Sequence, residues 1–206
     1  MVKQAVELAK RENARLIFLG DLIDRSDATP EESAACVRLV RESGAECVMG
    51  NHEAYSVFAR SASDMQAWWG VDAEKASRHF DEWLKIKEHL TLEDVEWLRS
   101  LPLYIQGSGW IAVHAKLTLN LPERFVSGSI TEAQIELLDR TKNEVFWAEE
   151  YDGRFGHCFF GHTRRSKLGQ HEWKSATLLD WDSKDLGTVG VARLKASNRD
   201  ITCLKE

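Results

Sequence analysis

The sequence lacks several features that would assign it to a particular class of protein. No apolar run approaches the roughly 18 residues of a membrane-spanning helix, and the opening residues, 1–5, include no apolar core of the signal-peptide type. The net charge is −6, so the basic face that general nucleic-acid binding requires is also missing. We therefore expect a cytoplasmic protein that binds neither membranes nor nucleic acids in general.

Paired cysteines and linkers are missing as well. The four cysteines are widely spaced and include no Cys-x-x-Cys pair, which argues against structural zinc and favours reduced thiols; they are Cys36, Cys47, Cys158 and Cys203. No repeat, low-complexity tract or linker interrupts the 206 residues, of which 43% are hydrophobic. We expect one domain, spanning residues 1–206, with a sizeable core.

The first fifty residues alternate between helical and strand-like patterns. Apolar residues at helical spacing predict helices over residues 2–12 and 31–43, the second closed by Gly44. Short apolar runs predict strands at Arg15–Leu19 and Cys47–Met49. This alternation indicates an α/β fold.

The rest of the chain is expected to be helical first and then strand-rich. Residues 53–100 look mostly helical, and Thr91 with Asp94 forms a capping-box pattern that opens a helix over Leu92–Ser100. Further strands are predicted at 111–113, 158–160, 177–179, 189–194 and 201–204. The eight tryptophans are most simply core anchors. The alternative is a hydrophobic lid or an oligomer contact made by residues 54–90.

Residues able to bind metal or transfer protons follow four of the predicted strands. The segments are Gly20-Asp21-Leu22-Ile23-Asp24-Arg25, Gly50-Asn51-His52-Glu53, Val113-His114-Ala115 and Gly161-His162-Thr163. In α/β folds, sites gather at the carboxyl ends of strands, and glycine lets the backbone approach an ion or a phosphate closely. One such segment is a weak signal, because a lone Asp after a strand is often a helix cap. Four in series indicate a site.

In this order and spacing, GDLIDR, GNHE, VHA and GHT resemble the calcineurin-like metallophosphoesterases. The nearest groups are the bacterial serine/threonine-type protein phosphatases and the diadenosine polyphosphatases, and the resemblance covers about residues 1–180. It implies a four-layer fold in which a β-sandwich is flanked by helices. It also implies a phosphoester hydrolase that uses metal-activated water.

The resemblance also implies roles for particular residues. Metal ligands would be Asp21, Asn51, His114 and His162, a mixed N/O set that suits Mn first, and Fe, Zn or Ni as alternatives. His52 would be the general acid, Asp24 would orient it, and Arg25 would bind phosphate through its planar guanidinium.

Structural roles are the alternative interpretation of the same residues. Asp24 and Arg25 could form a structural ion pair, His114 and His162 could be core histidines, and His52 could be a loop residue without a catalytic role. The remaining histidines fit no motif and are expected at the surface or in the core; they are His79, His89, His157 and His171.

One motif of this family has no counterpart. The family normally begins with a strand that ends in Asp-x-His-Gly and supplies a first metal position, but no Asp-x-His occurs in this sequence. A fragment or misplaced start, a shortened enzyme that works with one ion, and replacement by another element or a neighbouring chain would each explain this. We favour a shortened chain that lacks the first strand and binds one ion, with homo-oligomerisation as one way to cover the open strand edge.

Three functions follow from these expectations. The first is hydrolysis of phosphomonoesters, with a phosphoprotein or a small aryl phosphate as substrate. The second is cleavage of a nucleotide polyphosphate of the diadenosine type. The third is a degenerate phosphatase that acts as a binding module.

Overall fold

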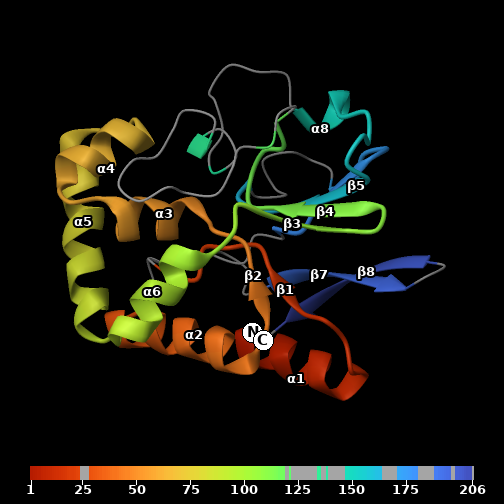
Figure 1. Ribbon diagram of the computed structural model, residues 1–206, viewed down its shortest axis with the longest axis horizontal. Helices are drawn as coiled ribbons and strands as arrows, with labels where there is room; N and C mark the ends of the chain where they lie inside the picture. Colours follow the sequence, from red (N-terminus) through yellow and green to blue (C-terminus); the bar gives the residue numbers. More distant parts are fainter. Residues whose placement is uncertain are drawn as a thin grey trace.

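The computed structural model describes residues 1–23, 28–118, 121, 134, 135, 138, 147–163, 171–180, 188–195 and 198–205. Helices and strands are mixed in this part of the chain, which confirms the predicted α/β class. In Figure 1, β1 and β2 lie between α1 and α2 on one side and the sheet of β3 and β4 on the other. No helix in the described ranges combines the length and apolarity needed to cross a membrane.

Helices α1 (Val2–Glu12) and α2 (Pro30–Ser43) occupy the positions that the sequence predicts. In α2, the side chain of Thr29 accepts a hydrogen bond from the backbone of Glu32, whose own side chain caps Thr29 in return. Gly44 ends the helix with φ of 74°, a left-handed conformation that glycine adopts without steric cost. Both helices bury one apolar face and leave the other to solvent.

Four helices fill the segment expected to be helical. They are α3 (Asn51–Phe58), α4 (Ala62–Trp69), α5 (Ala73–Glu88) and α6 (Leu92–Ser100). The Thr91 capping box opens α6 as predicted. Asp94 also receives the guanidinium of Arg41 from α2 at 2.9 Å, so the start of α6 is tied to α2. A short helix, α8 (Trp147–Glu150), precedes the later strands.

The strands of the described residues form three sheets. Parallel strands β1 (Ile17–Phe18) and β2 (Glu46–Cys47) form one pair, and antiparallel β7 (Thr188–Lys195) and β8 (Asn198–Lys205) form another. The third sheet has the order β3-β4-β5-β6 and contains β3 (Tyr104–Gly107), β4 (Trp110–Val113), β5 (His157–Phe160) and β6 (Ala176–Leu178).

Most predicted strands are present, with differences at their ends. β1 and β2 are only two residues long, because the residues that follow them turn out of the sheet toward the site described below. Strand β3 was not predicted; it pairs with β4 as a hairpin in register Tyr104↔Val113. The strands predicted at 189–194 and 201–204 lie inside β7 and β8.

The core lies between the helices and the sheets. Its largest buried side chains include Tyr55, Met49, Leu98, Ile111 and Phe160. Of the four cysteines, Cys36, Cys47 and Cys158 are free thiols, as predicted, whereas the side chain of Cys203 lies outside the described residues.

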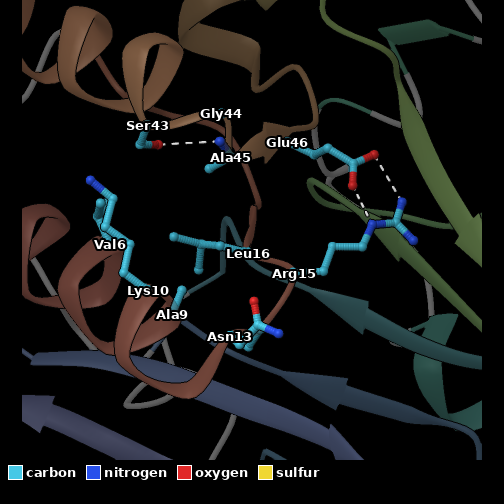
Figure 2. A pocket seen from close by; sticks show the side chains of 11 residues that line it. Val6, Ala9, Lys10, Asn13, Arg15, Leu16, Ser43, Gly44, Ala45 and Glu46 are labelled. Carbon is cyan, nitrogen blue, oxygen red and sulfur yellow. Dashed lines mark hydrogen bonds and ion pairs between the residues drawn. The ribbon is translucent and has the colours of Figure 1, made fainter.

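A hollow of about 440 Å³ lies at the amino ends of β1 and β2, against α1. Figure 2 shows Arg15 and Glu46 facing one another at its rim, with Val6, Ala9 and Leu16 across from them. The Arg15 guanidinium donates to both carboxylate oxygens of Glu46, one of them at 2.8 Å, and also lies over the ring of Trp110. The charges at this rim therefore neutralise each other.

Candidate metal centre

Four side chains from four separate segments converge at the carboxyl ends of β1, β2, β4 and β5. Asn51 Oδ1 lies 3.0 Å from His114 Nε2 and 3.0 Å from His162 Nδ1. The two imidazole nitrogens are 3.2 Å apart, and Asp21 Oδ1 lies 3.4 Å from His114 Nε2. These are the four residues that the resemblance implies as ligands, and they lie together.

The turns after the strands bring these side chains close. Gly20 has φ of 87°, and a Cβ there would lie 2.5 Å from the backbone nitrogen of Gly50. Only glycine therefore lets the β1 and β2 turns approach one another so closely. Asn51 is the first residue of α3, and the backbone nitrogen of Gly161 donates to His114 O at 2.8 Å, which fixes the β4 and β5 turns side by side.

Two of the converging residues have strained backbones. Asp21 has φ of 56° and His162 has φ of 64°, both in the left-handed region that L-residues seldom occupy. Such a conformation costs on the order of 1 kcal/mol or more per residue, and it persists where surrounding contacts fix it, often at functional sites.

The cluster has more hydrogen-bond acceptors than donors, which favours a bound cation. His114 Nδ1 donates to Leu19 O at 2.5 Å, which leaves Nε2 with a lone pair. Burial lowers the pKa of His114, so its neutral ring is favoured. Among His114 Nε2, Asn51 Oδ1 and His162 Nδ1, only the His162 nitrogen can supply a hydrogen. Converging lone pairs of this kind are satisfied by a positive ion.

The donor spacing also fits a metal ion. Bonds of about 2.1 Å to one ion place neighbouring donors roughly 3.0 to 3.4 Å apart, and four of the donor pairs in the cluster are separated by 3.0 to 3.4 Å. The donor atoms of Asp21, His114 and His162 all lie within 4.8 Å of one another. Burial opposes ionisation of Asp21, but positive charge on nearby imidazoles, when they are protonated, and the backbone hydrogen bond from His52 outweigh it and lower the pKa of Asp21, so Asp21 offers a carboxylate. The mixed N/O set suits a divalent transition metal.

Glu53 supports the cluster from beneath, a role that the sequence analysis did not assign. Its side chain is fully buried and accepts backbone hydrogen bonds from Asp21 at 2.8 Å, Leu22 at 2.6 Å, Ile23 at 3.3 Å and Gly50 at 3.0 Å. Burial, with the charge of Asp21 second, raises the pKa of Glu53 to about 7. The sequence signal for this role was a carboxylate three residues after Gly50, the glycine that follows β2.

His52 lies at the edge of the cluster. Its backbone nitrogen donates to Asp21 Oδ1 at 3.3 Å, and its half-buried ring meets the ring of Trp69 edge-on at 5.2 Å between centroids. The ring of His79 is 6.0 Å away. Neither Trp69 nor His79 belongs to a motif, so sequence reasoning did not place them here. Asp24 and Arg25 lie outside the described residues.

One protein family accounts for most of the chain. The sequence profile of the calcineurin-like phosphoesterases matches residues 2–187. Among curated proteins, none matches the sequence.

Solved structures share the fold. A candidate diadenosine tetraphosphatase is 20% identical, with 96% of this chain and 86% of that chain covered and a TM-score of 0.60. A serine/threonine phosphatase from Saccharomyces cerevisiae, similar to human phosphatase PP5, is 14% identical over 100% and 76%, with a TM-score of 0.52. A hypothetical protein from Pyrococcus horikoshii is 13% identical over 99% and 82%, with a TM-score of 0.53. At these identities the likeness shows a common fold.

Proposed function

This chain belongs to the calcineurin-like phosphoesterase family, and from that premise we propose that it hydrolyses phosphomonoesters with a divalent transition metal held by Asp21, Asn51, His114 and His162. The family supports a metal-dependent phosphoester hydrolase in general. The observation that carries the proposal is the convergence of four donor side chains at adjacent strand ends, where Asn51, His114 and His162 lie 3.0 to 3.2 Å from one another and Asp21 Oδ1 lies 3.4 Å from His114 Nε2. Mn is the preferred ion, with Fe, Zn or Ni as alternatives.

The residues around the ion would each have a separate task. When bound, the metal lowers the pKa of water and polarises a phosphoryl oxygen. Asp21 and Asn51 would supply oxygen ligands to the ion, and the two imidazoles would supply nitrogen ligands. His114 is oriented by its hydrogen bond to Leu19 O, an arrangement typical of metal-binding histidines.

His52 is the proposed general acid. Its backbone nitrogen donates to Asp21 Oδ1, so His52 adjoins a proposed metal ligand, and its imidazole would deliver a proton to the leaving oxygen. Asp24 and Arg25 keep the roles that the resemblance implies: Asp24 would orient His52, and Arg25 would bind phosphate with two parallel N–H donors.

A nucleotide polyphosphate is the second candidate substrate. The aromatic rings beside His52 favour it, because bases stack on such rings, and a candidate diadenosine tetraphosphatase shares the fold. Turnover of p-nitrophenyl phosphate and of diadenosine tetraphosphate with added Mn would separate the two substrates. Hydrolysis of neither, with no metal bound, would contradict the proposal and favour the degenerate binding module.

His52→Ala tests the general acid. We expect roughly 100-fold slower turnover of phenyl phosphate, a smaller loss with p-nitrophenyl phosphate, whose leaving group needs less protonation, and unchanged metal content. The exposed His89 at the end of α5 provides a matched control, and His89→Ala should retain full turnover. If metal content and turnover fell together, His52 would be a ligand and not the acid.

A further inference from the structure

Beside His52, α4 and α5 present a group of side chains that the proposed chemistry does not use. Trp69 ends α4, and its ring lies 4.5 Å from that of His79 on α5 and 5.5 Å from that of Tyr55 on α3. The ammonium of Lys75, in the first turn of α5, lies 4.8 Å over the Trp69 ring. An indole, an imidazole and an ammonium therefore adjoin His52.

His79 stands where an apolar residue would be expected. The buried residues of α5 are Ala76, Trp83 and Ile86, which form one stripe along the helix. His79 is three residues after Ala76 and four before Trp83, so it lies on the same stripe, yet it carries a polar ring and stays half-buried. At this point the stripe leaves the core and reaches His52, 6.0 Å away.

Trp69 likewise differs from a core tryptophan. Trp83 on the neighbouring helix is 4% exposed, whereas Trp69 is only partly buried and one of its faces is covered by a lysine side chain rather than by the core. A lysine on a flexible stem can move aside. The indole face beneath it can then receive a ligand ring.

Proton transfer from His52 to the leaving oxygen would place the leaving group of the substrate beside Trp69 and His79. In the proposed hydrolysis, the water oxygen bonds to phosphorus, the bond from phosphorus to the leaving oxygen breaks, and protonated His52 gives its proton to that oxygen. The products are an alcohol and phosphate, and a proton brought by the water is released and restores the acid form of His52. The substituent on the leaving oxygen therefore lies on the His52 side of the site. Trp69 and His79 are its neighbours on that side.

We propose that Trp69, His79 and Lys75 form a subsite for the leaving group, and that it selects phosphoesters whose leaving group carries an aromatic ring. This inference rests on the proposed function of the same site. Indole and imidazole rings stack with aryl groups and bases, and the lysine ammonium is attracted to electron-rich rings and to additional phosphates. Aryl groups and nucleobases share this chemistry, and the test separates them.

Binding of phosphonates tests the subsite without turnover, because their carbon–phosphorus bond is not hydrolysed. With Mn-loaded protein in a calorimeter, we expect benzylphosphonate to bind roughly 2- to 10-fold more tightly than methylphosphonate, the range that aromatic pairs produce. Trp69→Leu and His79→Gln should each reduce this ratio toward one. Trp97→Leu, which replaces another partly buried tryptophan on α6, should keep it.

Turnover with matched substrates distinguishes the two kinds of ring. The kcat/KM ratio of 2-phenylethyl to butyl phosphate reports an aryl preference, and that of adenosine 5′-monophosphate to ribose 5-phosphate reports a base preference; Trp69→Leu should lower at least one of them. Equal phosphonate affinities in the unmodified protein would overturn the subsite while leaving the hydrolase proposal intact. Ring-dependent binding without any hydrolysis would overturn the hydrolase proposal alone.

Discussion

The polar side chains at the two ends of the β1–β2 pair have contrasting environments. At the amino ends, Arg15 and Glu46 neutralise each other beside a hollow of about 440 Å³. At the carboxyl ends, Asn51 Oδ1, His114 Nε2 and His162 Nδ1 converge with at most one hydrogen among them, and the backbone of Asp21 is strained. Arg15 and Glu46, at the rim of the hollow, are paired with each other. The carboxyl ends bring together donors that a cation would satisfy, and for this reason we place the site there.

Removal of one of the proposed metal ligands at the carboxyl ends should have the largest effect. In Asn51→Ala and in His114→Ala, we expect metal affinity to fall at least 100-fold, beyond the 10- to 100-fold loss typical of supporting residues, and Mn-dependent turnover to fall with it. Equilibrium dialysis followed by elemental analysis measures the affinity. Unchanged stoichiometry in either variant would remove that residue from the coordination shell.

Glu53 and Asp94 form a matched pair for a second test, because both are fully buried and both accept backbone hydrogen bonds. Glu53 lies under the site, whereas Asp94 caps α6 and pairs with Arg41. Glu53→Gln and Asp94→Asn should each lower the free energy of unfolding by about 1 to 3 kcal/mol, because each leaves buried groups without partners. Only Glu53→Gln should also weaken metal binding, by roughly 10-fold. Equal metal affinity in both variants would refute a supporting role for Glu53.

The same two acids should respond to pH with opposite signs. The pKa of Glu53 is raised from 4.5 to about 7, so Glu53 ionises first in the unfolded chain, and its contribution to the stability of the metal-free protein should fall as pH rises from 4.5 to about 7. For Asp94, burial opposes ionisation, but hydrogen bonds from Thr91 and the charges of Arg41 and Arg38 lower its pKa. Its contribution should be lost as pH falls below 3.8.

Urea unfolding with a chelator present, repeated across this pH range, measures both contributions. Each single variant should remove one slope and keep the other. A Glu53→Gln variant whose metal-free stability changes with pH between 4.5 and 7 in the same way as that of the unmodified protein would contradict the account of Glu53.

Changes at the amino ends should have the smallest effect. The side chains of Arg15 and Glu46 are 54% and 42% exposed, and exposed ion pairs contribute about 1 kcal/mol or less. We expect Arg15→Gln and Glu46→Gln to shift stability by no more than that, with metal content and turnover unchanged. A loss of turnover in either variant would show that the hollow participates in function.

The sequence predicted local features better than contacts between distant segments. Helix α1 and the Thr91 capping box follow from spacing and capping chemistry, which act within a few residues. The four donors could be predicted because each follows a strand within a recognisable motif. Strand β3 was missed because Tyr104–Gly107 carries no clear alternation, and its pairing with β4 depends on the intervening turn.

Trp69 and His79 could not be predicted as neighbours of His52. Their proximity depends on how α4 packs against α5 and how both meet α3, and no local pattern encodes these arrangements. Glu53 is intermediate: its motif was visible, but its four backbone donors come from two turns that only the fold brings together. The prediction of a single metal ion remains a prediction.

Anomalous scattering from a crystal grown with Mn tests the central claim most directly. The account predicts a peak within bonding distance of Asp21, Asn51, His114 and His162, at the point where their donors converge. A fully Mn-loaded protein whose peak lies elsewhere, with no ion between these four side chains, would contradict it.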